Sequence, residues 1–89
     1  MGEQKILHLT LHREYFAEIV AGTKRREYRD RTDYWKTRLE GRSYDIIRFR
    51  NGYSADVPEM DVEFLGVDKQ RDGYAIRLGK ILRLVRWPA

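Results

Sequence analysis

The feature that most constrains the fold of this chain is a set of short segments with strand-like patterning. In residues 5–12, KILHLTLH, every second residue is a leucine, as expected for a strand with one buried face. Further strands are predicted at residues 24–31, 44–50, 59–69 and 74–85. Strands this short and this close in sequence leave little room for the crossovers of a doubly wound parallel sheet. The pattern therefore predicts a small antiparallel or mixed sheet, strongly bent or closed into a barrel.

Two short helices are predicted between the early strands. The first, at residues 13–21, has an apolar stripe formed by Tyr15, Phe16, Ile19 and Val20. Gly22 follows it, at a position where a left-handed C-cap favours glycine. We expect Asp33 to cap the second helix and Gly41 to end it. The order β-α-β-α-β-β-β predicts an α+β, mainly β fold with two peripheral helices.

Glycines in the second half of the chain mark the expected turns and bends. Asn51-Gly52 is a turn signal, and Arg71-Asp72-Gly73 is expected at the tip of a hairpin. Gly66 is expected at a β-bulge, and Gly79 at a bend in the last strand.

Length and residue content restrict the class of protein. With 89 residues the chain is long enough for one compact domain and too short for two, so residues 1–89 are predicted to form a single domain. The absence of cysteine excludes disulfides, thiolate metal sites and a catalytic cysteine. There is no apolar run of about 18 residues and no long apolar segment near the N-terminus, so we expect a cytoplasmic protein without a membrane partner.

The positive charge of the chain is concentrated in one stretch. The formal net charge is +4. Residues 24–50 hold ten basic and five acidic side chains, whereas the rest of the chain has eight basic and nine acidic ones. Clustered arginine suits phosphate, because the planar guanidinium can donate two parallel hydrogen bonds. A solvated basic surface without a specific ligand is the alternative interpretation.

The densest group of charged residues is Gly22-Thr23-Lys24-Arg25-Arg26-Glu27-Tyr28-Arg29, between the first helix and the second strand. In a strand Glu27 and Arg29 share a face, and Lys24 can reach the same place from the preceding turn. A carboxylate between cations can accept hydrogen bonds from a base while the cations meet phosphate. A lysine beside a carboxylate can also transfer protons when it is buried. An exposed ladder of ion pairs would explain the same residues without any ligand.

This segment also resembles a known family. The pattern Gly22-x-Lys24-x-x-Glu27-x-Arg29, after a strand and an amphipathic helix, is similar to the G-x-K-x-x-E-x-R motif of the ASCH domain. The resemblance covers about residues 6–87 and includes the order of the elements. It implies a PUA-like β-barrel with a basic cleft lined by Lys24, Glu27 and Arg29. The implied ligand is single-stranded RNA or a nucleotide, with DNA as a further candidate; no cofactor or metal is expected, and a protein partner is unknown.

Residues in and around this segment are predicted to contact nucleic acid. They are Gly22, Lys24, Arg26, Glu27, Arg29, Arg31, Arg48, Arg50 and Tyr53. Tyr53 lies on a glycine-containing turn and can stack on a base. Trp35 is instead expected to pack the second helix onto the barrel, and Trp87 to plug its end.

The resemblance leaves a catalytic role open. Some ASCH proteins are hydrolases of RNA or of a modified nucleoside, and Lys24 and Glu27 are the catalytic candidates if this chain is one. One branch hydrolyses the acetyl amide of N4-acetylcytidine with the motif lysine, a threonine three residues later and a distal glutamate. Lys24 matches the lysine, but Glu27 stands at the threonine position. The chain also turns directly at residues 71–73, where the branch has a helical insertion with the glutamate. Another member is described as a ribonuclease, and a coactivator-type protein-interaction module is the remaining alternative.

Two other groups of residues were considered as metal ligands. His8 and His12 share a strand face but lie about 13 Å apart along it, too far for one metal ion. An acidic run contains Asp56, Glu59, Asp61 and Glu63. Asp61 and Glu63 share a strand face and could hold Mg²⁺, but we expect the run to form a solvated face or to pair with nearby arginines.

Overall fold

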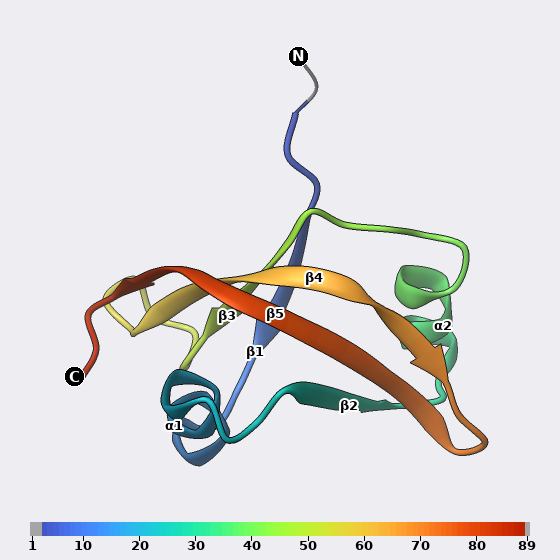
Figure 1. Ribbon diagram of the computed structural model, residues 1–89, viewed down its shortest axis with the longest axis horizontal. Coiled ribbons are helices and arrows are strands. Elements are labelled where there is room, and N and C mark those ends of the chain that lie inside the picture. Colours follow the sequence, from blue (N-terminus) through green and yellow to red (C-terminus); the bar gives the residue numbers. More distant parts are fainter. Residues whose placement is uncertain (1–2, 89) are drawn as a thin grey trace.

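The computed structural model describes residues 3–88 and shows the seven elements in the predicted order (Figure 1). They are β1 (Ile6–Thr10), α1 (Arg13–Ala21), β2 (Arg26–Asp30), α2 (Asp33–Leu39), β3 (Ile46–Arg50), β4 (Glu59–Lys69) and β5 (Gly73–Val85). The fold is mainly β with two short helices, as the sequence predicts.

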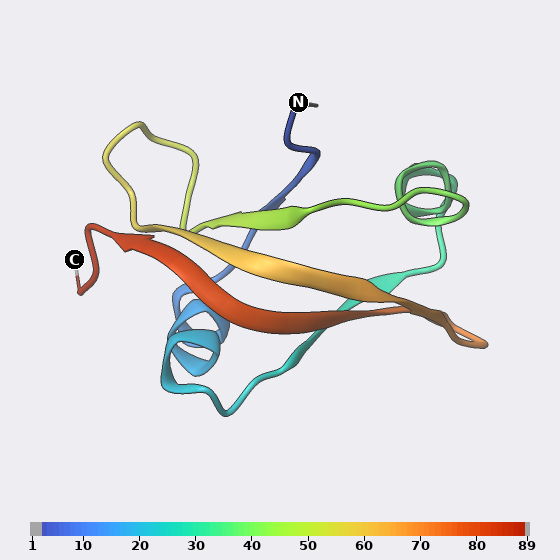
Figure 2. The same cartoon turned by 45° about the horizontal axis from the view of Figure 1, so that its top comes forward.

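The five strands form one mixed sheet that curls into a half-barrel (Figures 1 and 2). Its strand order is β1-β3-β4-β5-β2. The β1–β3 pair is parallel and the other three pairs are antiparallel. The two edge strands, β1 and β2, are the first two strands of the chain, and the barrel is open between them.

The long strands β4 and β5 carry the irregularities that let the sheet curl. Their register shifts between Val62 and Phe64, opposite the part of β5 that contains Gly79, and again between Phe64 and Gly66. Gly66 has φ +129°, and a Cβ there would lie 2.4 Å from Nη2 of Arg77. The shift at Gly66 confirms the predicted bulge, and the shift opposite Gly79 is of the kind that increases local twist and bending.

Helix α1 packs a narrower apolar stripe than the sequence indicates. Phe16 and Ile19 are buried, and Gly22 ends the helix in the left-handed conformation with φ +82°. Tyr15, predicted to lie in the buried stripe, is 42% exposed. Its position at the margin of the stripe leaves its ring free to contact the segment that follows Gly22.

Helix α2 begins one residue earlier than predicted, and Asp33 is not its N-cap. The cap is Thr32, whose hydroxyl oxygen accepts a hydrogen bond from the backbone N–H of Trp35 at 3.3 Å. Asp33 is instead the first helical residue, where a negative charge favours the N-terminal end of the helix dipole. Leu39 is buried, and the half-buried Trp35 packs against the core.

The core fills the concave side of the sheet, and the two helices lie at opposite ends of the molecule (Figures 1 and 2). Its fully buried side chains are Phe16, Ile47, Phe49, Met60, Val62, Tyr74 and Ile76. Trp87 packs on Phe16 with ring centroids 5.1 Å apart, in keeping with its predicted role as a plug. Within residues 3–88, neither helix is long and apolar enough to cross a membrane.

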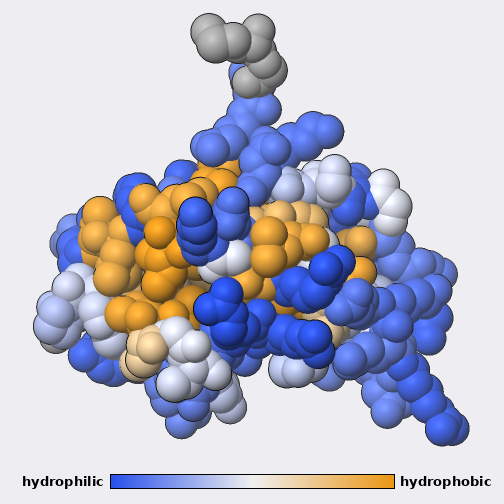
Figure 3. Space-filling view, in the orientation of Figure 1, coloured by the Kyte–Doolittle hydropathy of each residue, from blue (hydrophilic) through white to orange (hydrophobic). Residues whose placement is uncertain are grey.

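The end of β5 exposes several apolar side chains. Ile81, Leu82 and Leu84 are each more than one third exposed. Figure 3 shows apolar residues gathered on the left of this face, where β5 ends, and hydrophilic residues on the right. The exposed segment lies beyond the part of β5 that pairs with β2.

Candidate functional site

The motif residues lie on β2 and on the turn before it, at one edge of the half-barrel. Glu27 and Arg29 are opposite Ile76 and Tyr74 of β5, so both side chains point to the concave face. Glu27 is only 6% exposed. A buried carboxylate needs partners, because moving an unpaired charge out of water is costly.

Lys24, Glu27 and Arg29 converge on one another. Nζ of Lys24 lies 3.2 Å from Oε1 of Glu27, and Nη2 of Arg29 lies 2.7 Å from Oε2. Each carboxylate oxygen therefore faces one cation. The pairs are partly shielded from water, so they are stronger than the exposed ladder that was the alternative interpretation.

Aromatic rings hold both cations from the other side. The ammonium of Lys24 lies 5.4 Å from the ring centroid of Tyr15 and 5.6 Å from that of Tyr28. The guanidinium of Arg29 lies 5.0 Å from the ring of Trp35. These distances are within the range of cation–π attraction. Helices α1 and α2 each contribute an aromatic wall, so the site depends on both.

Arg29 also joins the two free edges of the sheet. Its Nη2 donates a hydrogen bond to the carbonyl oxygen of Thr10 at 3.3 Å, across the opening between β2 and β1. Its Nε is buried and has no hydrogen-bond partner within the described part of the chain. The Nε–H of this guanidinium therefore remains without an acceptor beside the ion pair.

The turn before β2 is set by the end of α1. The left-handed Gly22 redirects the chain, and the backbone N–H groups of Thr23 and Lys24 both donate to the carbonyl oxygen of Glu18. These hydrogen bonds fix the path of the chain from the end of α1 to Lys24. The position of the Lys24 ammonium therefore depends on the two-residue spacing between Gly22 and Lys24.

A hollow of about 440 Å³ lies beside Lys24. Its lining consists of Glu18, Thr23, Lys24, Arg25, Arg26 and Tyr28. Glu27 does not line it, because its side chain points to the opposite face of β2 from those of Arg26 and Tyr28. The accessible wall of the site is therefore basic and aromatic, with the carboxylate behind it.

The other predicted residues near β2 lie at its margins. Arg26 is exposed and stands opposite Arg77 in the β2–β5 register. Arg31 follows the end of β2 and donates from Nη1 to the carbonyl oxygen of Arg71 at 3.5 Å. Both cations flank the motif, and neither forms an ion pair with Lys24, Glu27 or Arg29 within residues 3–88.

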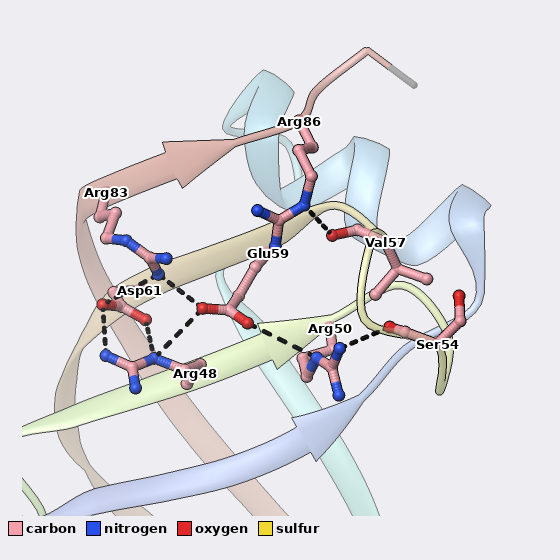
Figure 4. Close-up of polar contacts among 8 residues, drawn as sticks. All are labelled: Arg48, Arg50, Ser54, Val57, Glu59, Asp61, Arg83 and Arg86. Carbon is pink, nitrogen blue, oxygen red and sulfur yellow. Dashed lines mark hydrogen bonds and ion pairs between the residues drawn. The ribbon is translucent and has the colours of Figure 1, made fainter.

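Arg48 and Arg50 are separated from the motif by the thickness of the sheet. Ile47 and Phe49 point into the core, so the alternating Arg48 and Arg50 point to the outer face. Arg48 forms a bidentate ion pair with Asp61: its Nε donates to Oδ1 at 2.7 Å and its Nη2 donates to Oδ2 at 3.0 Å. Arg50 donates from Nη2 to the carbonyl oxygen of Ser54 at 2.6 Å. Figure 4 shows both guanidinium groups engaged with the acidic run and the loop before it.

Two residues of the acidic run, Glu59 and Asp61, pair with arginine, one of the two arrangements expected from the sequence. Oε1 of Glu59 lies 2.7 Å from Nη1 of Arg83, and Asp61 is held by Arg48 (Figure 4). The hydrogen bond from Arg48 keeps the pKa of Asp61 below its usual value, and the hydrogen bond from Arg83 does the same for Glu59. No group of three acidic or histidine side chains in residues 3–88 is placed to hold a metal ion.

Tyr53 lies apart from the ion pair. It is 88% exposed on the loop between β3 and β4. It lines a hollow of about 230 Å³ with Thr10 and His12, among other residues. Thr10 is also the acceptor for Arg29, so this hollow lies on the β1 side of the opening.

Two aromatic residues of the site were missed from the sequence. The sequence predicts Tyr15 in the buried stripe of the first helix and predicts no role for Tyr28. Tyr28 could have been found from strand alternation, since it must face outward when Glu27 and Arg29 face inward. The contact of Lys24 with Tyr15 depends on the geometry of the helix end, so it cannot be predicted from the spacing of the two residues in the sequence.

Similarity to known proteins gives no further information about this site. Comparison of the chain with protein-family models, with curated proteins and with solved structures gives no match.

Proposed function

We propose that this chain is an ASCH-type domain that binds single-stranded RNA or a nucleotide beside Lys24, Glu27 and Arg29. The observation that carries the proposal is the buried Glu27 held between two cations at the open edge of the half-barrel. Each of these cations is backed by an aromatic ring. An RNA ligand also fits the cytoplasmic location expected from the sequence.

The electrostatics of the cluster favour an anionic ligand. Two cations share one carboxylate, so the cluster carries net positive charge, and Arg25 and Arg26 extend it along the neighbouring hollow. The side chain of Arg29 remains partly exposed, so its charge adds to the positive potential that a ligand meets. Tyr15 and Tyr28 are exposed next to Lys24 and can stack on a base.

The proposal is tested by fluorescence anisotropy with a labelled random-sequence RNA hexamer at several salt concentrations. We expect affinity to fall steeply with salt, because phosphate contacts release counterions. Lys24→Met and Arg29→Met should each weaken binding about tenfold, the loss expected for a charged hydrogen bond. Arg42→Gln is the charge-matched control, since Arg42 is exposed and lies outside the motif.

Absence of salt-sensitive RNA binding by the folded wild-type protein would reject the proposal. Equal losses in Arg42→Gln and Lys24→Met would show that only the overall charge matters. A DNA hexamer of the same composition measured in parallel distinguishes recognition of ribose from recognition of phosphate alone.

A second candidate function is hydrolysis of a modified nucleoside or of RNA. The contact of 3.2 Å between Nζ of Lys24 and the carboxylate of Glu27 favours it, because such a pair can pass a proton. Incubation with N4-acetylcytidine and with short RNAs, followed by mass spectrometry, is the test. Product that disappears in Lys24→Met would support hydrolysis, and unchanged substrates alongside intact RNA binding would reject it.

A further inference from the structure

A second groove opens where β2 and β5 separate. The β2–β5 pairing ends with the hydrogen bond from the N–H of Leu78 to the carbonyl oxygen of Arg25 at 3.0 Å. Beyond it β5 continues to Val85 and pairs only with β4. Figures 1 and 2 both show the segment between α1 and β2 turning away from β5 here. The groove, of about 340 Å³, lies between this segment and the open edge of β5.

The groove combines an apolar floor with a basic rim. Ile19, Leu78 and Ile81 provide apolar side chains. The cations are Lys24, Arg25 and Lys80. A nucleotide presents matching chemistry, with a base and sugar that leave water readily and a phosphate that binds lysine and arginine.

Two of the three rim cations are not neutralised by the protein. Within residues 3–88, neither Arg25 nor Lys80 forms an ion pair, whereas Arg48 and Arg83 on the outer face are paired with Asp61 and Glu59. The carboxylate of Glu63 accepts the backbone N–H of Lys80 at 3.1 Å and does not line the groove. Two charges are thus left available to a ligand.

The groove is continuous with the proposed binding site. Lys24 and Arg25 line both this groove and the 440 Å³ hollow beside Tyr28. Glu18 is the one acidic residue lining the hollow, and no acidic residue lines the groove. A chain of phosphates can therefore pass from one to the other over Lys24 while meeting mainly positive charge.

We propose that this groove is a second nucleotide subsite in which Arg25 and Lys80 hold a phosphate. The inference rests on the proposed function and specifies its ligand. A strand of at least two nucleotides, and not a free nucleoside, would occupy the site beside Tyr28 and the groove together. Lys80, which is distant from the motif in sequence, becomes a binding residue of the same surface.

The test uses the labelled RNA hexamer with Arg25→Gln and Lys80→Gln, and Arg42→Gln as the matched control. Each groove variant should weaken hexamer binding about tenfold, the loss expected for one charged hydrogen bond. Each should also lower the slope of log affinity against log salt by about 0.7, the value for one phosphate of a single strand. Competition by nucleoside monophosphates should be the same for wild type and Lys80→Gln, because a single nucleotide occupies only the first site.

The possible outcomes separate the two proposals. If both groove variants bind the hexamer like Arg42→Gln while Lys24→Met still weakens binding about tenfold, the second subsite is rejected and the proposed function stands. If wild type binds no RNA, both are rejected. If poly-L-glutamate competes as well as RNA of equal charge, the groove recognises charge alone and its assignment to nucleotides is overturned.

Discussion

Glu27 is a buried acid whose charge is balanced locally by Lys24 and Arg29. Glu27→Gln keeps the size of the side chain but leaves these two cations close together without a counterion. We expect the free energy of unfolding to fall by about 1–3 kcal/mol, as for loss of a hydrogen bond to a charged group. Urea unfolding at pH 7 measures the change.

Glu3→Gln is the control for this substitution, because Glu3 is exposed and lies outside the helices and strands. It should change stability by less than about 0.5 kcal/mol. A Glu27→Gln protein as stable as Glu3→Gln would show that the carboxylate contributes nothing to holding the two cations.

The lowered pKa of Asp61 makes the stability of the protein depend on pH in the acid range. Its pKa is lowered chiefly by the hydrogen bond from Arg48, so the folded protein holds the ionised carboxylate more strongly than the unfolded chain does. The resulting stability is fully present above the usual carboxyl pKa of 3.8 and is lost as the pH falls through the lower value of the folded state.

The expected result for Asp61→Asn is a loss of about 1–3 kcal/mol at pH 7 and a smaller loss near pH 3. Urea midpoints between pH 2.5 and 7 test this, with wild type showing the steeper fall in acid. Asp68→Asn is the control, because Asp68 is an exposed partner of Arg77. Parallel wild-type and Asp61→Asn curves would mean that the pair with Arg48 does not contribute.

At the scale of single elements, α2 depends on its cap. It has seven residues, too few for an isolated helix to be stable in water. The Thr32 hydroxyl satisfies the N–H of Trp35, the residue that packs against Arg29. Thr32→Ala should therefore cost about 1 kcal/mol of unfolding free energy and loosen the ring over the guanidinium.

Urea unfolding and tryptophan fluorescence measure these two effects of Thr32→Ala. Thr37→Ala is the matched control, because the Thr37 hydroxyl donates to the carbonyl of Asp33 within the same helix and caps nothing. If the two variants unfold at the same urea concentration, the cap does not determine the stability of this helix.

The elements themselves could be predicted from the sequence because they depend on local patterns. Leucine alternation identified β1, and the glycines identified the helix end at Gly22 and the bulge at Gly66. The cap of α2 could not be distinguished, since Thr32 and Asp33 both favour that position. The end of β2 was also placed one residue late, because charged residues continue past Asp30 without a change in pattern.

The partners of Arg48 and Arg50 depend on pairing between strands, and the sequence does not resolve them. Their partners, Asp61 and Glu59, lie opposite them only in the observed β3–β4 register. The loop between these strands is too long for its length to fix that register. Counting the positive charge of residues 24–50 together therefore grouped arginines from two different faces.

At the scale of the whole molecule, the candidate site is assembled by the opening of the half-barrel. Period-two alternation was enough to place Glu27 and Arg29 on one face. The acceptor on Thr10, the ring of Trp35 and the groove cation Lys80 come from other elements. These contacts depend on how the sheet curls, and so they could not be read from the motif.

The last segment of the chain ties this curled sheet to α1. Trp87 packs against Phe16, and the guanidinium of Arg13 lies 4.6 Å from its ring centroid. The contact joins the end of β5 to the first helix, which also supplies Tyr15 to the site. Trp87→Ala should therefore lower the free energy of unfolding by about 2–4 kcal/mol, because it leaves a gap beside a fully buried phenylalanine.

Urea unfolding followed by circular dichroism measures this loss independently of the missing indole. Trp87→Phe, which keeps a ring beside Phe16, should lose less than Trp87→Ala because it leaves a smaller gap. If Trp87→Phe is more stable than Trp87→Ala, the loss in Trp87→Ala comes from missing packing against Phe16 and not from a local change in the backbone. Equal stability of Trp87→Ala and wild type would show that the end of the chain does not brace α1, and that the Lys24–Tyr15 contact is set by α1 and β2 alone.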